Sequence, residues 1–180
     1  MKVGIKVTNN NEHNVEIREA VGSDAKTIID FYQMVGGETD FLSFGKGEFK
    51  QDVIEYKKEI EQTRSQSNSI MILALIQHEI VGIATIHSSQ RERSKHSGTL
   101  GIVIAKAFAG KGIGKTLMNE LLGWASTNGI TRKINLATRE DNAHAIKLYK
   151  QLGFEQEGVI RKETFMNGRY YDTIMMGLFL

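Results

Sequence analysis

The chain has 180 residues, of which 41% are hydrophobic and 24% are charged, and its formal net charge is +2 at pH 7. These values are typical of a globular protein that buries a substantial core, so we expect residues 1–180 to form a single domain. They argue against a disordered chain and against a nucleic-acid-binding protein, and no apolar run reaches the roughly 18 residues that span a membrane. The amino terminus also has no apolar signal core, so a cytoplasmic location is expected. Because cysteine is absent, disulfides, thiolate metal ligands and a cysteine nucleophile are excluded.

The first part of the chain predicts one strand followed by two helices. Residues 1–14 are polar and predict a strand start or a frayed tail, whereas residues 15–19 alternate apolar and charged side chains as a half-buried strand does. Residues 23–24, Ser and Asp, are a suitable N-cap for a helix that ends near Val35. Apolar residues recur at helical spacing through residues 48–66, which predicts a second helix.

Residues 38–47, between these helices, form a loop that contains apolar and aromatic side chains. Such a loop can line the mouth of a substrate site, and Glu38, Phe41 and Leu42 are therefore candidate substrate contacts. The alternative is that Phe41, Leu42 and Phe44 cap the hydrophobic core, because aromatic side chains are more often packed than functional.

The middle of the chain predicts an antiparallel meander. Apolar runs at residues 69–76 and 79–87 are joined by two residues, and a polar turn at 88–98 leads to a third run at 99–104. A glycine-rich loop and an amphipathic helix follow. The next strand, at residues 133–137, should lie parallel to the strand at 99–104 because a helical crossover joins them.

The last part of the chain predicts a helix and a hairpin. Residues 141–142, Asp and Asn, cap a helix that Gly153 ends, and the Asn-Gly pair at 167–168 joins strand-like segments at 154–164 and 170–180. We therefore expect an α/β (α+β) fold with a mixed, mostly antiparallel sheet of about seven strands flanked by about four helices.

The glycine-rich loop is a candidate anion site. Gly110, Gly112 and Gly114 occupy alternate positions, so the backbone can turn its N–H groups toward a ligand without Cβ clashes. The helix that begins there adds the positive end of its dipole, and Lys111 and Lys115 add charge, which together favour a phosphate or pyrophosphate. The alternative is a plain strand-to-helix turn in which the glycines only permit the corner.

Spacing separates the known types of phosphate loop. A dinucleotide fingerprint, G-x-G-x-x-G, fails because its third glycine would fall at Leu117. A P-loop, G-x-x-x-x-G-K-[ST], is matched at Gly114, Lys115 and Thr116 but has Ala109 in place of its first glycine. This near match remains an alternative, although a P-loop domain needs further parallel strands that the rest of the chain does not predict.

A second motif lies about 30 residues downstream, in residues 142–154. With the loop, it resembles the GCN5-related N-acetyltransferase (GNAT) superfamily, whose loop has the form [Q/R]-x-x-G-x-G and whose later helix has the form N-x-x-A-x-x-L-Y-x-x-x-G-F. The helix pattern is matched at Asn142, Ala145, Leu148, Tyr149, Gly153 and Phe154. The resemblance covers at least residues 99–180, and the tail is similar to the bacterial branch that includes ribosomal-protein and small-amine acetyltransferases.

The resemblance implies acetyl-CoA as the acetyl donor and a sheet that splits at the cofactor site. Strand-edge backbone groups at residues 102–104 would hold the pantetheine arm, the loop would hold the pyrophosphate, and Asn142 would bind nearby. Ala109 departs from the family's Gln or Arg, so one side-chain contribution is missing. The cofactor residues implied are Ile102, Val103, Ile104, Ala109, Gly110, Lys111, Gly112, Ile113, Gly114, Lys115 and Asn142.

The resemblance also implies direct transfer of the acetyl group to a primary amine, either a small molecule or a protein N-terminus. Tyr149 matches the family's general acid, which protonates the leaving thiolate, and a phenol with an ordinary pKa near 10 suits that role. The alternative is a helix tyrosine that is packed in the core.

The general base is not identified by the sequence. Two positions at which family members carry the base or an acceptor contact are Ala137 and Thr99 here, and neither side chain can act as a base. His87, His96, Glu38 and Glu92 remain candidates. We expect no metal, and a homodimer is compatible with the sequence. A non-catalytic acetyl-CoA-binding module stays open as a second class of function because the base is missing.

Overall fold

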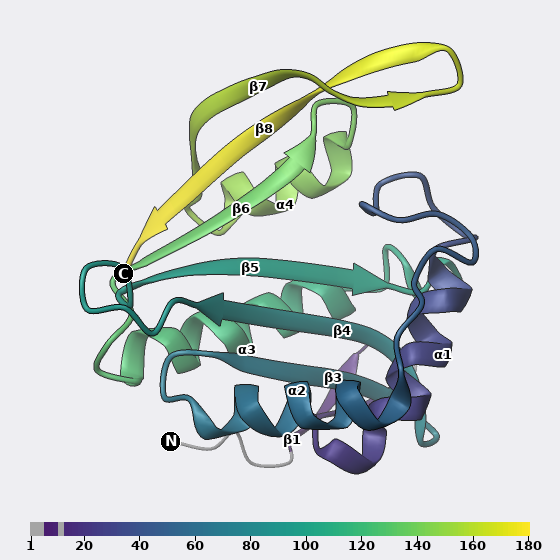
Figure 1. The fold of residues 1–180 in the computed structure, drawn as a ribbon, viewed down its shortest axis with the longest axis vertical. Helices are drawn as coiled ribbons and strands as arrows, with labels where there is room; N and C mark the ends of the chain where they lie inside the picture. The colour runs from purple at the N-terminus through teal and green to yellow at the C-terminus, as the bar shows by residue number, and fades with distance from the viewer. Residues whose placement is uncertain (1–5, 11–12) are drawn as a thin grey trace.

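A computed structural model describes residues 6–10 and 13–180 of the chain (Figure 1). Within them, one mixed sheet has the strand order β1-β2-β3-β4-β5-β6-β8-β7. Every neighbouring pair is antiparallel except β5 and β6. The strands are β1 Lys6–Asn10, β2 His13–Glu19, β3 Ile70–Ile76, β4 Glu79–Ser88, β5 Ser97–Ile104, β6 Lys133–Arg139, β7 Glu155–Met166 and β8 Arg169–Phe179. The helices are α1 Ala25–Val35, α2 Val53–Ser65, α3 Ile113–Thr127 and α4 Ala143–Gln151.

The sheet and the helices confirm the expected fold class. The described residues form eight strands, where about seven were expected, because part of the polar segment at the amino terminus forms β1 and the start of β2. The other residues of that segment, 1–5 and 11–12, lie outside the described part of the chain.

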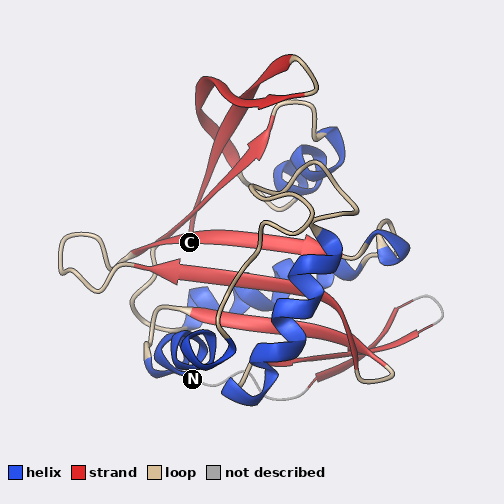
Figure 2. Ribbon diagram, turned by 45° about the vertical axis from the view of Figure 1, so that its right-hand side comes forward, coloured by secondary structure: helices blue, strands red, loops and turns tan. Residues whose placement is uncertain are grey.

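Helices cover both faces of the sheet (Figures 1 and 2). Successive side chains of a strand point to opposite faces, so the apolar run of β3 serves two cores. Ile72 belongs to a cluster with Leu117 and Leu121 of α3, whereas Leu73 belongs to a cluster with residues of α1 and α2. β3 is apolar without interruption because both faces of the sheet are covered there.

The second helix starts later than expected, and the first starts at the expected place but without a side-chain cap. The second helix begins at Val53 rather than near Glu48, because the Asp52 carboxylate accepts the N–H groups of Ile54 and Glu55 at 2.9 and 3.0 Å and so caps the helix there. The first helix follows a 3-10 turn, Gly22–Asp24, and no side chain caps it. The Asp24 carboxylate instead accepts two hydrogen bonds from Arg18.

The parallel pair β5 and β6 is short. The two strands pair at three positions only, residues 97–99 with residues 133–135. Beyond Thr99 they separate, and β6 continues with β8 and β7 on a second limb of the sheet (Figure 1). The expected split is therefore confirmed. Within the described residues, the edge of β5 from Leu100 to Ile104 has no strand partner on that side.

The core against α3 should dominate stability. Leu117 is fully buried there, so Leu117→Ala should lower the free energy of unfolding by about 2–5 kcal/mol through lost burial and a residual cavity. Urea unfolding of the two proteins measures this difference. Ile54→Ala, at a position that is 66% exposed, should change the value by less than about 0.5 kcal/mol. Similar losses for both variants would contradict the packing described.

Candidate functional site

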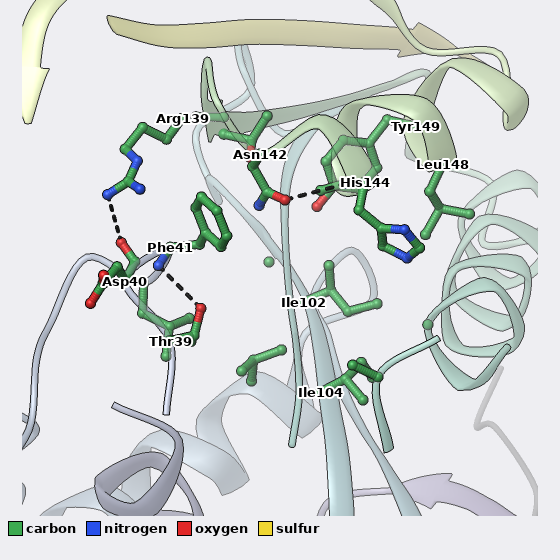
Figure 3. Close-up of a pocket in the computed structure, with 18 of the residues that line it drawn as sticks. Thr39, Asp40, Phe41, Ile102, Ile104, Arg139, Asn142, His144, Leu148 and Tyr149 are labelled. Carbon is green, nitrogen blue, oxygen red and sulfur yellow. Dashed lines mark hydrogen bonds between the residues drawn. The ribbon is translucent and has the colours of Figure 1, made fainter. Parts of the chain in front are cut away.

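A cleft of about 1550 Å³ follows the split between β5 and β6 (Figure 3). Known sites for a single small ligand have volumes of about 300–1,000 Å³, so this cleft has room for more than one small molecule. Most of its wall comes from β5, the glycine loop with the start of α3, the end of β6 with α4, the loop after α1, and β7 with β8. Tyr32 of α1 and Ile83 and Thr85 of β4 line it as well. Segments far apart in the sequence therefore meet at the split.

The glycine loop presents a row of backbone donors to the cleft. Gly110 and Gly112 have φ values of +76° and +82°, a backbone conformation that residues with a Cβ rarely adopt. Helix α3 begins at Ile113 with Gly112 as its N-cap, and no side chain caps it. The N–H groups of its first turn have no acceptor within the helix, and the helix dipole places partial positive charge on them. The loop therefore fits a phosphate or pyrophosphate.

Gly114 keeps a passage open between α3, α4 and β5. A Cβ at this position would lie 3.8 Å from Ile104 and Leu148 and 3.9 Å from Ile102, with nothing nearer. These side chains come from β5 and α4, which face each other across the split (Figure 3). A slender, extended ligand arm can follow the unpaired edge of β5 here, as an added strand would.

Most of the predicted cofactor residues line the cleft, and positive side chains surround them. The exceptions are Lys111, whose ammonium lies 5.1 Å from the Phe108 ring, and Ile113, whose side chain is buried in the core and which can contribute only its backbone. The predicted residues that line the cleft are Ile102, Val103, Ile104, Ala109, Gly110, Gly112, Gly114, Lys115 and Asn142. Lys106, His144 and Lys147 line it as well, although no sequence motif singled them out.

Tyr149 and Asn142 reach the cleft from α4. The Asn142 side-chain oxygen accepts the N–H of Ala145 at 3.3 Å and caps the helix, as expected. The Tyr149 side chain is 7% exposed and packs against Phe154, with 6.0 Å between ring centroids. Within the described residues its hydroxyl has no hydrogen-bond partner, and burial raises its pKa to about 12. Tyr149 is therefore a protonated phenol at neutral pH, which suits a proton donor.

The loop after α1 lines the other end of the cleft, as predicted from Glu38, Phe41 and Leu42. The Glu38 carboxylate accepts the N–H of Lys106 at 2.9 Å, which ties this loop to the segment after β5. Leu42 also packs against the core, so both interpretations of the loop hold for it. Of the four candidate bases only Glu38 lines the cleft.

Thr99 is not brought into the cleft. It lies opposite His87 of β4 and Asn135 of β6, in the short stretch where β5 is paired on both sides. The split opens only beyond this residue, and the substrate contact of Thr99 stays a prediction.

Arg139 and Glu163 are among the charged residues of the cleft that the sequence analysis missed. Arg139 ends β6, two residues beyond the predicted end of the strand, and its guanidinium holds the Asp141 carboxylate at 2.6 and 2.9 Å. This pair keeps the pKa of Asp141 below its usual value. Asp141 therefore neutralises Arg139, and Asn142 alone caps α4. The only signal in the sequence was a basic residue two positions before the Asp-Asn cap.

Glu163 reaches the cleft through a bulge in β7. Ile160 pairs with Thr173 and Thr164 pairs with Tyr171, so the three residues between them face a single residue of β8. Such bulges redirect side chains, and Glu163 lines the cleft. This register cannot be obtained from the sequence pattern.

Comparison with known proteins identifies the family. Residues 38–154 match the model of the Acetyltransferase (GNAT) family, and the chain belongs to this family. A crystal structure of an acetyltransferase of the GNAT family from Streptococcus pneumoniae has a TM-score of 0.90 and 33% identity, over 92% of this chain and 99% of that one. The family excludes the P-loop alternative, as does the antiparallel pairing of β5 with β4.

Two curated relatives are similar over part of their length. The L-amino acid N-acetyltransferase AaaT of Escherichia coli (strain K12) is 35% identical over 105 residues, which are 58% of this chain and 65% of that protein. The spermidine N(1)-acetyltransferase of Vibrio cholerae is 36% identical over 98 residues, which are 54% of this chain and 52% of that protein. The chain thus aligns with between about half and two thirds of these relatives. In the described residues no helix is long and apolar enough to cross a membrane. The homodimer expected from the sequence stays a prediction.

The protonation of Tyr149 can be measured without any ligand. Because burial disfavours the phenolate, Tyr149 should stay protonated up to a pH near its raised pKa of about 12. Wild type and Tyr149→Phe should then show the same phenolate absorbance from about pH 9 to 11, where an ordinary tyrosine ionises. A difference between the two proteins centred near pH 10 would contradict the buried phenol.

Proposed function

We propose that the protein is an N-acetyltransferase that moves an acetyl group from acetyl-CoA directly to a primary amine. The observation that carries the proposal is that the glycine loop, the unpaired edge of β5 and the Tyr149 phenol line one cleft. Membership of the Acetyltransferase (GNAT) family and the names of the relatives support it.

The cleft fits acetyl-CoA in three respects. The first-turn N–H groups of α3, with Lys115 beside them, are donors for a pyrophosphate. The missing side chain at Gly114 leaves the passage that a pantetheine arm needs, beside the open edge of β5. The Gln or Arg that the family usually has at Ala109 is absent, so the backbone and the lysines carry this binding. When bound, acetyl-CoA supplies the acetyl group and a thiolate leaving group.

Two groups of the protein serve the transfer. Backbone N–H groups of β5 stabilise the negative charge that develops on the carbonyl oxygen as the amine attacks. Tyr149 holds a proton at neutral pH and can give it to the leaving sulfur. The phenol needs no charge partner for this role, because a tyrosine is protonated at neutral pH and burial raises its pKa further.

The acceptor end contains carboxylates that can receive a proton from the amine, either directly or through water. Glu38, Asp40 and Glu163 all line the cleft. Glu38 is the candidate that sequence and structure share, and its contact with the Lys106 N–H fixes its position. The acceptor is an amine, and the relatives are named for an amino acid and for spermidine.

Release of CoA from acetyl-CoA, measured against a panel of amines, tests the proposal. The panel holds L-amino acids, spermidine and a peptide with a free N-terminus, and at least one amine should turn over. Tyr149→Phe should lower kcat by about 10²- to 10⁴-fold because the proton donor is lost, while acetyl-CoA affinity stays within about twofold.

Three other outcomes would count against this account. Unchanged turnover by Tyr149→Phe would remove Tyr149 as the acid. Binding of acetyl-CoA without turnover of any amine would favour the non-catalytic acetyl-CoA-binding module. Failure to bind acetyl-CoA at millimolar concentration would contradict the proposed function altogether.

A further inference from the structure

Arg139 lies where three segments of the cleft wall meet. It ends β6, next to the turn that starts α4, and its side chain reaches the loop after α1 (Figure 3). Its Nη1 donates to the backbone carbonyl of Asp40 at 2.9 Å, a contact between residues 99 positions apart in the chain. It also contacts the β7–β8 hairpin, because the Tyr171 ring lies 4.2 Å from its Cζ. The side chain is 8% exposed.

The loop after α1 has an aromatic contact with the same guanidinium. The centroid of the Phe41 ring lies 4.7 Å from the Arg139 Cζ, although Phe41 is 45% exposed. The cation–π interaction with Arg139 stabilises the position of Phe41, because a half-exposed ring gains little from apolar burial alone. Two consecutive loop residues therefore contact the Arg139 side chain, Asp40 through its carbonyl and Phe41 through its ring.

Arg139 has little capacity left for a substrate. Its Nε and Nη2 donate to Asp141 and its Nη1 to Asp40, with the Met166 sulfur 3.9 Å from the same nitrogen. Asp141 also neutralises its charge. An arginine that bound a carboxylate of the acceptor would need two free guanidinium N–H donors and a positive charge that no carboxylate of the protein neutralises. The geometry therefore fits a residue that positions the wall of the cleft.

We propose that Arg139 is a positioning residue that holds loop residues 38–44 against the acceptor end of the cleft and thereby sets the affinity for the acceptor. Through this loop it also positions Glu38, the candidate base. This inference rests on the proposed function for its effect on an acceptor. Its effect on the loop does not depend on activity.

Arg139→Gln and Arg139→Lys test the proposal, with Arg18→Gln as the matched control. Arg18 also makes a two-contact pair with an aspartate, at 2.7 and 2.9 Å from Asp24, but neither residue lines the cleft. The Arg139 variants should raise the KM for the acceptor about tenfold and leave the KM for acetyl-CoA within about twofold. Lysine should not rescue, because it lacks the planar fork that bridges Asp141 and Asp40. The Arg18 variant should leave both constants unchanged.

Cleavage by chymotrypsin after Phe41 and Phe44, located by mass spectrometry, measures the loop without any substrate. Both Arg139 variants should be cleaved there about tenfold faster than wild type and Arg18→Gln, because the loop has lost its fastening. Equal cleavage rates in all four proteins would overturn the proposal even if the acceptor KM rises, since Arg139 would then act on the acceptor directly. Full rescue by lysine would also overturn it. If wild type turns over no amine, the proposed function fails, and the cleavage rates alone decide whether Arg139 holds the loop.

Discussion

The site depends on the short pairing between β5 and β6. Three parallel positions join the two strands, and beyond them the sheet divides into two limbs. Because the edge from Leu100 to Ile104 has no strand partner on that side in the described residues, its backbone groups are available to hydrogen-bond an extended ligand. The helix α3, which makes the crossover between the two strands, starts at the same end of the split and adds its free N–H groups.

The two ends of the cleft are built by different means. At the cofactor end the backbone makes the site, through glycines with positive φ and through an uncapped helix start. At the acceptor end side chains make it, through the contacts of Arg139 and the bulge that redirects Glu163. The backbone site suits a ligand that all members of a family share, whereas the side-chain site can differ from one acceptor to another.

The same division explains what the sequence could predict. Glycine spacing and the Asn142–Phe154 motif depend on neighbours in the chain, so the loop, the helix and Tyr149 were found without a structure. The meander, the parallel pair and the final hairpin were predicted because short turns and one crossover leave few alternatives, whereas the full strand order was not. Arg139 contacts Asp40 and Tyr171, which lie far away in the sequence, and only the fold brings them together. Glu163 enters the cleft through the register of β7, which the sequence pattern does not contain. The residue at which β5 and β6 separate leaves no pattern in either strand, so the sequence could not show that the split opens only beyond Thr99.

The central claim is that the opening between β5 and α4 receives acetyl-CoA, and calorimetric titration of Gly114→Val tests it most directly. Gly114 has an ordinary helical backbone, so valine can be accommodated without backbone strain. Its side chain would instead fill part of the passage beside Ile102, Ile104 and Leu148. Gly123→Val, on the same helix with nothing within 4 Å, controls for the cost of valine in α3. We predict that Gly114→Val weakens acetyl-CoA binding at least about tenfold while Gly123→Val binds as wild type does. Equal affinities in all three proteins would contradict the account.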